Sequence, residues 1–370
     1  MTEPTRNMRL ARRISGGKRR RAPAPRTRRE HRYVTLQDVA QRAGVSAKTV
    51  SRVVNQQGEV SDLTRRRIQK AIKELRYRPN VLARALIHSR SNTLAAVAWG
   101  IDYFGPSRTV IGIEQQAEEL GYSLFLCLVR EAQHHDHQRL LDTLLSRRVD
   151  GIIWAVPQVG DNHRWLSQSR MRQLPPMVFL SMAPLPGFTV VQVDNRAGAQ
   201  QAVQHLVARG RRRIGILAGP LLWWEARERV EGWRTALELA DLEASDRLKV
   251  ECPWTAAGGQ NAMQELLQRV PEVDGVFAAS DQIGLGALQT LSAAGRRVPE
   301  DVALVGFDDI PEAPYFRPPL SSVHQKLTEV GRSAVRQLHA LIQPGAGRRP
   351  PATGGLTVVA PQLVVRASSL

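Results

Sequence analysis

The stretch Val34-Thr-Leu-Gln-Asp-Val-Ala-Gln-Arg-Ala-Gly-Val-Ser-Ala-Lys-Thr-Val-Ser-Arg-Val-Val-Asn55 decides the fold of the amino-terminal part of this chain. Apolar residues recur at helical spacing on both sides of Gly44, which supplies a backbone that can turn sharply. Ser46 is placed to cap the second helix. A third apolar group at helical spacing follows in residues 63–75. The pattern predicts a helix-turn-helix unit whose second helix enters the major groove of DNA by its amino-terminal end.

The exposed side of that second helix has the residue types that read DNA. Arg52 can grip a guanine with two hydrogen bonds, Lys48 can donate to guanine, and the methyl group of Ala47 can meet a thymine methyl. Small polar residues nearby suit phosphate contacts, which fix the register without reading the sequence. The predicted DNA contacts are Thr35, Ser46, Ala47, Lys48, Thr49, Ser51, Arg52, Asn55, Ser61 and Thr64.

The charge distribution supports a polyanionic partner. The chain has 370 residues and a net charge of +18. Residues 1–32 hold 12 Lys and Arg against 2 acidic residues, residues 33–88 hold 11 against 4, and the remainder holds 29 against 28. A basic surface that served only solubility would spread its charge more evenly. The first quarter of the chain is therefore expected to bind nucleic acid, and the Arg-rich residues 1–32 are expected to be disordered.

Several classes of protein are disfavoured. The sequence has no apolar run long enough to span a membrane, and the basic amino terminus lacks the apolar segment of a secretory signal. Cys127 and Cys252 are far apart, which favours a reducing cytoplasm over a disulfide framework or a zinc site. His134, His135 and His137 lie in a polar stretch without further ligands, so we interpret them as a solvated loop. No catalytic constellation stands out, and we expect no enzyme, no metal and no cofactor.

From about residue 94 onward, short apolar strands alternate with amphipathic helices. This alternation predicts parallel sheets with helices on both faces, and the number of strands favours two similar α/β lobes over one. Strands are expected at residues 94–98, 123–128, 151–156, 177–180, 190–193, 214–218, 275–279 and 302–306. Helices are expected at residues 110–120, 197–208, 226–240, 283–294 and 330–341.

The run from Val34 through Leu86 closely resembles the headpiece of the lactose-repressor (LacI) family. The motif TVSRVVN at Thr49–Asn55 and the Tyr77-x-Pro79-Asn80 end carry the resemblance, which continues to the carboxyl terminus. In this family a hinge helix, here Asn80–His88, orders when two subunits lie side by side on DNA, and its Leu enters the minor groove. Leu86 could instead be a core residue of a linker helix. The resemblance adds Tyr77, Asn80, Ala83 and Leu86 to the expected DNA contacts.

The resemblance also implies the domain organisation. After the tail, a headpiece is expected at residues 33–79, a hinge helix and linker at 80–92, and an effector-binding and dimerisation domain at 93–370. The expected fold class is an all-α helix-turn-helix headpiece followed by a two-lobed α/β sensor of the periplasmic-binding-protein type with parallel sheets. No heptad repeat follows at the end, so the resemblance implies a homodimer rather than a tetramer.

An effector pocket is implied at the carboxyl ends of the sensor strands, where open α/β sheets bind ligands. Arg229 and Asp308 fall on the family's sugar-hydroxyl-binding Arg and Asp, and Trp254 falls on its ligand-stacking Trp. Glu225 stands where the family's lactose-binding member has Ser, and no close counterpart is found for its ligand residues between 154 and 185. The expected pocket residues are Phe104, Pro106, Ser107, Trp224, Glu225, Arg229, Trp254, Ser280, Gln282, Phe307 and Asp308.

Some of these assignments compete with structural roles. Trp233 lies on an amphipathic helix and is expected in the core. Asp309 could cap the following turn. Arg227 and Arg229 point to different sides of one helix, so only one of them can reach a ligand.

The functional expectation is a cytoplasmic, nucleoid-associated, sequence-specific DNA-binding transcription regulator that acts as a repressor. Its partners would be a pseudo-palindromic operator in double-stranded DNA and a mono- or disaccharide effector. The additional aromatic pair Trp223 and Trp224 is compatible with a larger, flatter ligand such as a β-linked disaccharide. Ligand would alter the angle between the lobes and so the pairing of the hinge helices. A purine-responsive regulator, a periplasmic sugar-binding protein and a nucleoid architectural protein are the alternatives.

Overall fold

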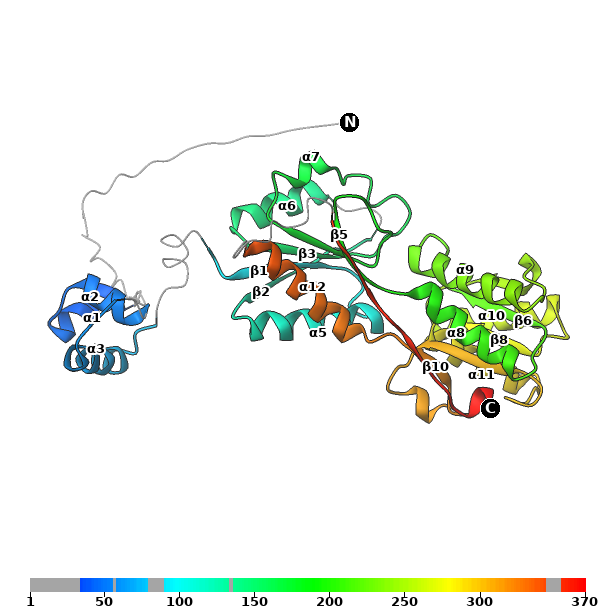
Figure 1. Cartoon of the computed structure of the whole chain (residues 1–370). Helices are drawn as coiled ribbons and strands as arrows, with labels where there is room; N and C mark the ends of the chain where they lie inside the picture. Colours follow the sequence, from blue (N-terminus) through cyan, green and yellow to red (C-terminus); the bar gives the residue numbers. More distant parts are fainter. Residues whose placement is uncertain (1–33, 56–57, 79–89, 133–135, 344–353) are drawn as a thin grey trace, which may run out of the picture. The chain divides into compact units, whose positions relative to one another are not determined.

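The computed structural model describes residues 34–55, 58–78, 90–132, 136–343 and 354–370. The chain divides into two compact units, residues 1–80 and 81–370 (Figure 1). The expected tail at residues 1–32 and the hinge residues Asn80, Ala83 and Leu86 lie outside the described residues.

The first unit is a helix-turn-helix domain made of α1 (Leu36–Ala43), α2 (Ala47–Val54) and α3 (Asp62–Leu75). Thr35 and Asp38 form a capping box at the start of α1. Gly44 ends α1 with φ of 65°, a left-handed conformation that a side chain would strain. The side chains of Val39, Val50 and Ile68, one from each helix, are fully buried and join the three helices. The predicted helix-turn-helix fold is confirmed.

The second unit contains two α/β lobes, as predicted. Among the described residues, each lobe has a six-stranded sheet, with strand order β11-β5-β4-β3-β1-β2 in one and β12-β10-β9-β8-β6-β7 in the other. The strand pairs are parallel except for β10 and β12, which run antiparallel. Buried parallel strands read as continuous apolar runs, and β6 is buried at every position.

The amino-terminal lobe is built mainly from the first half of this unit. Its strands are β1 (Thr93–Ala98), β2 (Ser123–Leu128), β3 (Gly151–Ala155), β4 (Met177–Leu180), β5 (Thr189–Val193) and β11 (Leu356–Val359). Its helices are α5 (Phe104–Glu119), α6 (His137–Ser146), α7 (Gln168–Met171) and α12 (Leu327–Ile342).

The carboxyl-terminal lobe takes up most of the remainder. Its strands are β6 (Ile214–Ala218), β7 (Lys249–Glu251), β8 (Gly275–Ala278), β9 (Ala303–Asp308), β10 (Ser321–His324) and β12 (Gln362–Val364). Its helices are α8 (Asn195–Ala208), α9 (Trp224–Leu239), α10 (Ala256–Arg269) and α11 (Asp281–Ala293). Short 3-10 helices lie at Asp246–Leu248, Ala313–Tyr315 and Ala367–Ser369.

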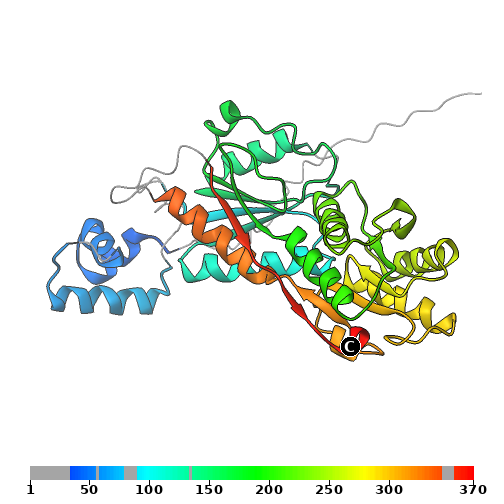
Figure 2. The same ribbon diagram turned by 45° about the vertical axis from the view of Figure 1, so that its right-hand side comes forward.

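Within the described residues, the chain passes between the lobes after β5, after β10 and after β11. The last passage is visible in both views as the red segment that contains β11 and β12 (Figures 1 and 2). These passages lie side by side at the carboxyl ends of β5 and β10, so they connect the lobes at one edge of the space where ligands of such sheets bind.

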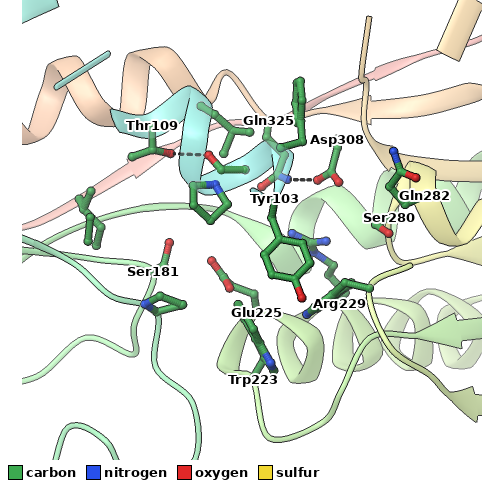
Figure 3. Close-up of a pocket in the computed structure, with 18 residues that line it drawn as sticks. Tyr103, Thr109, Ser181, Trp223, Glu225, Arg229, Ser280, Gln282, Asp308 and Gln325 are labelled. Carbon is green, nitrogen blue, oxygen red and sulfur yellow. Dashed lines mark hydrogen bonds between the residues drawn. The ribbon is translucent and has the colours of Figure 1, made fainter. Parts of the chain in front are cut away.

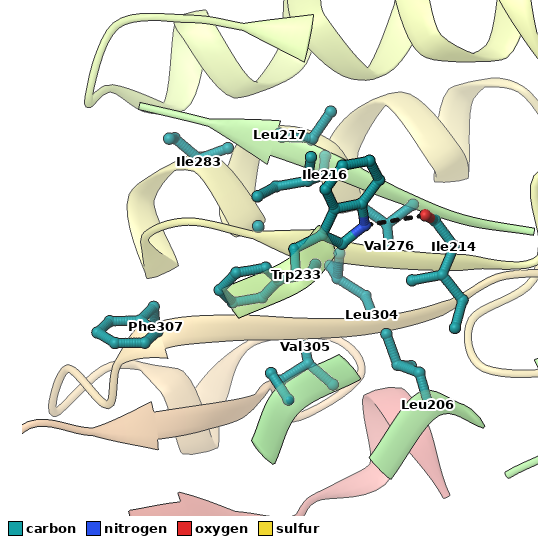
Figure 4. Close-up of a cluster of buried hydrophobic side chains, with 14 of the residues drawn as sticks. Leu206, Ile214, Ile216, Leu217, Trp233, Val276, Ile283, Leu304, Val305 and Phe307 are labelled. Atoms are coloured by element: carbon teal, nitrogen blue, oxygen red, sulfur yellow. Dashed lines mark hydrogen bonds between the residues drawn. The ribbon is translucent and has the colours of Figure 1, made fainter. Parts of the chain in front are cut away.

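The core of the carboxyl-terminal lobe is organised around Trp233. This side chain is fully buried, and its indole N–H donates to the carbonyl of Ile214 at 3.0 Å (Figure 4). Leu217, Val276 and Leu304 are buried in the same apolar cluster. The prediction that Trp233 belongs to the core is confirmed, and its satisfied N–H explains why a residue of this size can be buried at no cost in hydrogen bonding.

The sequence pattern missed β7, β10, β11, β12, α6, α7 and α10. The reason is clearest at β10, whose residues Ser321 and Ser322 are fully buried although they are polar. Ser321 donates to the carbonyl of Arg366 at 2.9 Å, and Ser322 donates to the carboxylate of Asp281 at 2.6 Å. Hydrogen bonds from distant segments thus satisfy a strand that shows no apolar pattern.

Candidate functional site

In the first unit, the exposed side of α2 presents the residues expected to read DNA. Lys48 and Arg52 are exposed, whereas Ala47, Thr49 and Ser51 are half-buried. Ser46 caps the helix, since its hydroxyl accepts a hydrogen bond from the backbone N–H of Thr49 at 3.1 Å. The cap fixes the end of the helix at which basic side chains would meet base edges.

The expected phosphate-contacting residues are already hydrogen-bonded to one another. Asn55 donates to the Ser51 hydroxyl at 3.1 Å, and Ser61 donates to the Thr64 hydroxyl at 3.0 Å. Such pairs pre-order side chains that can still accept or donate further bonds. Tyr77 differs from the expectation, because only 7% of it is exposed and it packs in the core of the headpiece.

In the second unit, a cavity of about 850 Å³, its open mouth included, lies between the two lobes (Figure 3). Its walls follow the carboxyl ends of β1, β3 and β4 in one lobe and of β6, β7, β8 and β9 in the other. The lining residues are Tyr103, Phe104, Gly105, Pro106, Thr109, Ala155, Pro157, Leu180, Ser181, Trp223, Glu225, Arg229, Trp254, Ser280, Gln282, Asp308, Gln325 and Leu327.

Arg229 is the buried cation of this cavity, with only 6% of its surface exposed. Its Nε donates to Asn195 at 2.8 Å and its Nη1 donates to the carbonyl of Ala279 at 2.5 Å. The guanidinium also lies over the ring of Phe307, 3.9 Å from the centroid. These contacts fix the fork of donors in one orientation, and they leave Nη2 to meet a ligand.

Asp308 provides a carboxylate on the same side of the cavity. Its backbone φ of 115° is rarely adopted by a residue with a side chain, and Gln325 donates a hydrogen bond to its carboxylate. Burial raises the pKa of Asp308 to about 6, against the opposing effects of Arg229 and Gln325. Burial also raises the pKa of Asp281 behind it, and Asp308 adds to that shift. An arginine beside a carboxylate can bind adjacent sugar hydroxyls by paired hydrogen bonds.

Aromatic rings from both lobes form one wall of the cavity. The rings of Trp223 and Trp254 meet edge to face, with centroids 5.9 Å apart. Trp99 lies 5.2 Å from Trp223 and 5.7 Å from Tyr103, so the aromatic contacts continue into the amino-terminal lobe. The indole N–H of Trp254 has no hydrogen-bond partner within the described residues. The wall therefore offers apolar ring faces for stacking.

The lobes are also joined beside this wall by backbone hydrogen bonds. The N–H of Trp224 donates to the carbonyl of Gln158 at 3.0 Å, and the N–H of Gly160 donates to the carbonyl of Leu222 at 2.8 Å. The two lobes are therefore closed on each other next to Trp223.

The structure brings most of the expected pocket residues together, but not all. Ser107 does not line the cavity, because its hydroxyl donates to the carbonyl of Phe104 at 2.9 Å. Trp224 is buried outside the cavity, and its neighbour Trp223 takes the place expected for it. Phe307 is fully buried and does not line the cavity, but its ring packs against the guanidinium of Arg229.

The competing assignments are resolved by the same contacts. Arg227 donates to the carbonyls of Leu221 and Leu222, at 2.8 and 3.0 Å, so Arg229 is the arginine at the cavity. Asp309 forms an ion pair with Arg366 at 2.7 Å and lies 3.2 Å from Nδ1 of His324, so its carboxylate is engaged by these side chains rather than by the following turn.

Sequence reasoning missed lining residues from the amino-terminal lobe and from the passages between lobes. They are Tyr103, Gly105, Thr109, Ala155, Pro157, Leu180, Ser181, Gln325 and Leu327, while Trp223, which the sequence singled out only as an additional aromatic residue, also lines the cavity. Ala155, Pro157, Leu180 and Ser181 lie at or just beyond the ends of β3 and β4. The rule that ligands bind beyond strand ends could have identified them.

Other features concern metals and membranes. Among the described residues, no group of three or more His, Cys, Asp or Glu side chains is placed to hold a metal ion. His134 and His135 are outside the described residues, and His137 stacks on Trp165 with centroids 5.0 Å apart. No described helix is long and apolar enough to cross a membrane.

Comparison with known proteins places this geometry in context. Residues 35–80 match the model of bacterial regulatory proteins of the lacI family, and residues 203–369 match that of a periplasmic binding protein-like domain. The ribose operon repressor of Escherichia coli strain K12 is 35% identical over 314 residues, which cover 84% of this chain and 94% of the repressor. The chain belongs to the LacI family. It is a DNA-binding transcription regulator with an effector-binding domain.

Solved structures agree with the LacI-family assignment. The Lac repressor dimer bound to operator and the anti-inducer ONPF aligns with a TM-score of 0.83 at 30% identity, covering 91% of this chain and 99% of that one. A complex of the transcriptional regulator CelR with cellobiose aligns with a TM-score of 0.67 at 36% identity, covering 90% and 99%. The expected fold class is confirmed.

In this LacI-family regulator, Gly219 is expected to be required for the position of Trp254. A Cβ at Gly219 would clash with the Trp254 ring, so Gly219→Ala must displace the indole. Loss of a stacking face should weaken ligand binding about tenfold, or roughly 1.4 kcal/mol. Titration calorimetry and tryptophan fluorescence measure the two effects. Gly355→Ala is the control, because a Cβ there meets nothing within 4 Å; equal changes in both variants would contradict this role.

The raised pKa of Asp308 predicts a pH dependence. Between its ordinary value of 3.8 and about 6, the folded protein holds a proton that the unfolded chain has released. The stability of the ligand-free protein should therefore fall as pH rises through this window. Asp308→Asn should reduce the fall without abolishing it, because Asp281 and Glu225, also raised in pKa by burial, face the same Arg229.

Melting temperatures from pH 4 to 8 test this prediction. Asp301→Asn is the control, because the side chain of Arg297 lowers the pKa of Asp301, so this carboxylate stays ionised over the measured range and its removal should leave the slope of the profile unchanged. The prediction fails if Asp308→Asn and the wild type show the same pH profile.

Proposed function

We propose that this protein is a sugar-responsive transcription repressor that binds a pseudo-palindromic operator as a homodimer and releases it when a neutral saccharide binds between the lobes. The arrangement of Arg229 and Asp308 beside an aromatic wall carries the proposal, because this combination offers hydrogen bonds to the hydroxyl groups of a sugar and a ring face to its apolar side.

The several aromatic rings at the cavity favour a ligand of two sugar rings, because each ring can stack on one apolar sugar face. The 36% identity to CelR, solved with cellobiose, supports a β-linked disaccharide of that kind. A purine effector would need groups that read ring nitrogens. The carboxylates of Glu225 and Asp308 also accept hydrogen bonds from ring N–H groups, so the screen below includes two purines beside the saccharides.

The domain organisation proposed for this function keeps the boundaries expected from the sequence: a tail at residues 1–32, a headpiece at 33–79, a hinge and linker at 80–92 and the effector domain at 93–370. Similarity to a dimeric Lac repressor bound to operator supports a dimer. We place the protein in the cytoplasm, at the nucleoid, and assign it no enzymatic activity.

The proposal is tested by a thermal-shift screen of the purified protein. The panel contains glucose, ribose, cellobiose, lactose, hypoxanthine and guanine. A ligand at about 100 times its dissociation constant stabilises the protein by roughly 2.7 kcal/mol, which raises the melting temperature visibly. A raised melting temperature with a saccharide supports the proposal. A rise with a purine would show that the effector is a purine, and no rise with any saccharide would contradict the saccharide assignment.

A further inference from the structure

The charges around the cavity are unbalanced. Its lining contains two carboxylates, Glu225 and Asp308, and one cation, Arg229. Asp281 adds a third carboxylate close behind, hydrogen-bonded to Ser322 and to the backbone N–H of Ile310. No ion pair within 4.0 Å joins Arg229 to a carboxylate in the described part of the chain. The carboxylates therefore lie near the guanidinium without forming a close ion pair with it, and the cavity keeps an excess of negative charge.

Glu225 lies in the position where an anionic ligand would otherwise be attracted. It is in the first turn of α9, and a helix amino terminus favours negative charge. Figure 3 shows its carboxylate directed toward the middle of the cavity, between Ser181 and Tyr103. Ser181, from the opposite lobe, lies beside this carboxylate in the cavity wall. A fixed carboxylate thus occupies the favourable place for a phosphate.

Cations outside the cavity do not change this balance. Arg108, Lys326 and Arg332 line a neighbouring groove, which shares the wall residues Phe104, Asp308 and Leu327 with the cavity. Arg108 and Lys326 are exposed, so water and salt screen them, and Arg332 is paired with Glu119 at 2.6 Å. Arg227, the remaining arginine near the start of α9, is directed to the carbonyls of Leu221 and Leu222.

We infer that Glu225 is a specificity-determining residue that, together with Asp308, selects uncharged saccharides and excludes those that carry a phosphate. A carboxylate accepts hydrogen bonds from hydroxyl groups, whereas it can only repel a phosphate dianion. The inference rests on the proposed saccharide response and deepens it.

The test uses matched pairs of ligands on the full-length protein. The pairs are glucose with glucose 6-phosphate, ribose with ribose 5-phosphate, and cellobiose with cellobiose 6′-phosphate. The affinity for each ligand is measured by titration calorimetry at pH 8. The wild type is expected to bind at least one neutral sugar and to bind its phosphate about 100-fold more weakly, as a charge at this distance in a partly buried site requires. This comparison needs no variant.

Variants then assign the discrimination to Glu225. Glu225→Gln is expected to reduce the ratio of neutral-sugar affinity to sugar-phosphate affinity about tenfold. Glu225→Asp keeps the charge and is expected to preserve most of this ratio. Glu228→Gln is the matched control, because Glu228 lies on the same helix but pairs with Arg196 outside the cavity. It should leave the ratio unchanged.

The outcomes separate the inference from the function on which it rests. If the wild type binds phosphates as tightly as the neutral sugars, the inference is overturned while the saccharide response stands. Equal changes in Glu225→Gln and Glu228→Gln would attribute discrimination to overall charge and also overturn it. If neither set binds, the saccharide proposal fails, and the inference falls with it.

Discussion

Replacing Arg229 with lysine should weaken saccharide binding about 100-fold, or roughly 3 kcal/mol, and leave operator binding without ligand unchanged. The guanidinium bonds Asn195 and Ala279 while it lies over Phe307, and its remaining amino group is left for the ligand. A lysine ammonium keeps the positive charge among the carboxylates but cannot reproduce this fork of donors. The expected phenotype is a regulator that stays on its operator when sugar is added.

Arg227→Lys is the matched control for this experiment. Arg227 lies on the same helix, two residues away, and its guanidinium bonds backbone carbonyls outside the cavity. Titration calorimetry should show a change of less than about threefold for this variant. Similar losses for Arg227→Lys and Arg229→Lys would contradict the assignment of Arg229 as the ligand-binding arginine. Melting temperatures of both proteins check that folding is retained.

Arg52→Ala should weaken operator binding by about 1–3 kcal/mol per half-site and have little effect on unrelated DNA. Arg52 is exposed in the last turn of α2, the helix that Ser46 caps. An arginine that bonds a base edge contributes to specificity, whereas one that bonds only phosphate weakens all DNA binding together. The ratio of operator to non-operator affinity is therefore the informative quantity.

Fluorescence anisotropy with labelled operator and with a scrambled duplex measures this ratio, after the operator has been selected from random sequences. Lys70→Ala removes one exposed cation from α3 and serves as the control. Its ratio should stay at the wild-type value. A uniform loss in Arg52→Ala on both duplexes would show that Arg52 contacts only the backbone.

The sequence predicted the fold well because periodicity reports local burial. Buried strands such as β6, whose backbone bonds to β7 and β8, and amphipathic helices such as α12 show a regular apolar pattern. Strand β10 does not, since Ser321 and Ser322 depend on partners from Arg366 and Asp281. Such long-range satisfaction leaves no periodic signal.

The cavity could be predicted in kind but not in detail. Phe307 and Asp308 are adjacent at the end of β9, and side chains alternate along a strand, so they face opposite sides. Trp223 is the extended residue before α9, and Trp224 is the first helical residue, so one turn of backbone decides which ring faces the cavity. Both distinctions depend on where an element ends, which sequence patterns locate poorly.

The residues missed from the amino-terminal lobe have a different cause. Ser181 and Glu225 meet across the cavity although they lie on different lobes. The angle at which two lobes close is set by contacts that no local pattern encodes, such as the backbone bonds between Gln158 and Trp224. A sequence therefore predicts which strand ends contribute side chains to the cavity. It does not predict as readily which of these side chains contact one another.

The most direct test of the account is the effect of a bound saccharide on the operator complex. The pre-formed complex of protein and labelled operator is titrated with the sugar identified in the thermal-shift screen, and anisotropy follows release. The account predicts that the wild type releases the operator near the sugar's dissociation constant and that Arg229→Lys does not. An operator complex that stays intact while the wild type is saturated with sugar would contradict it.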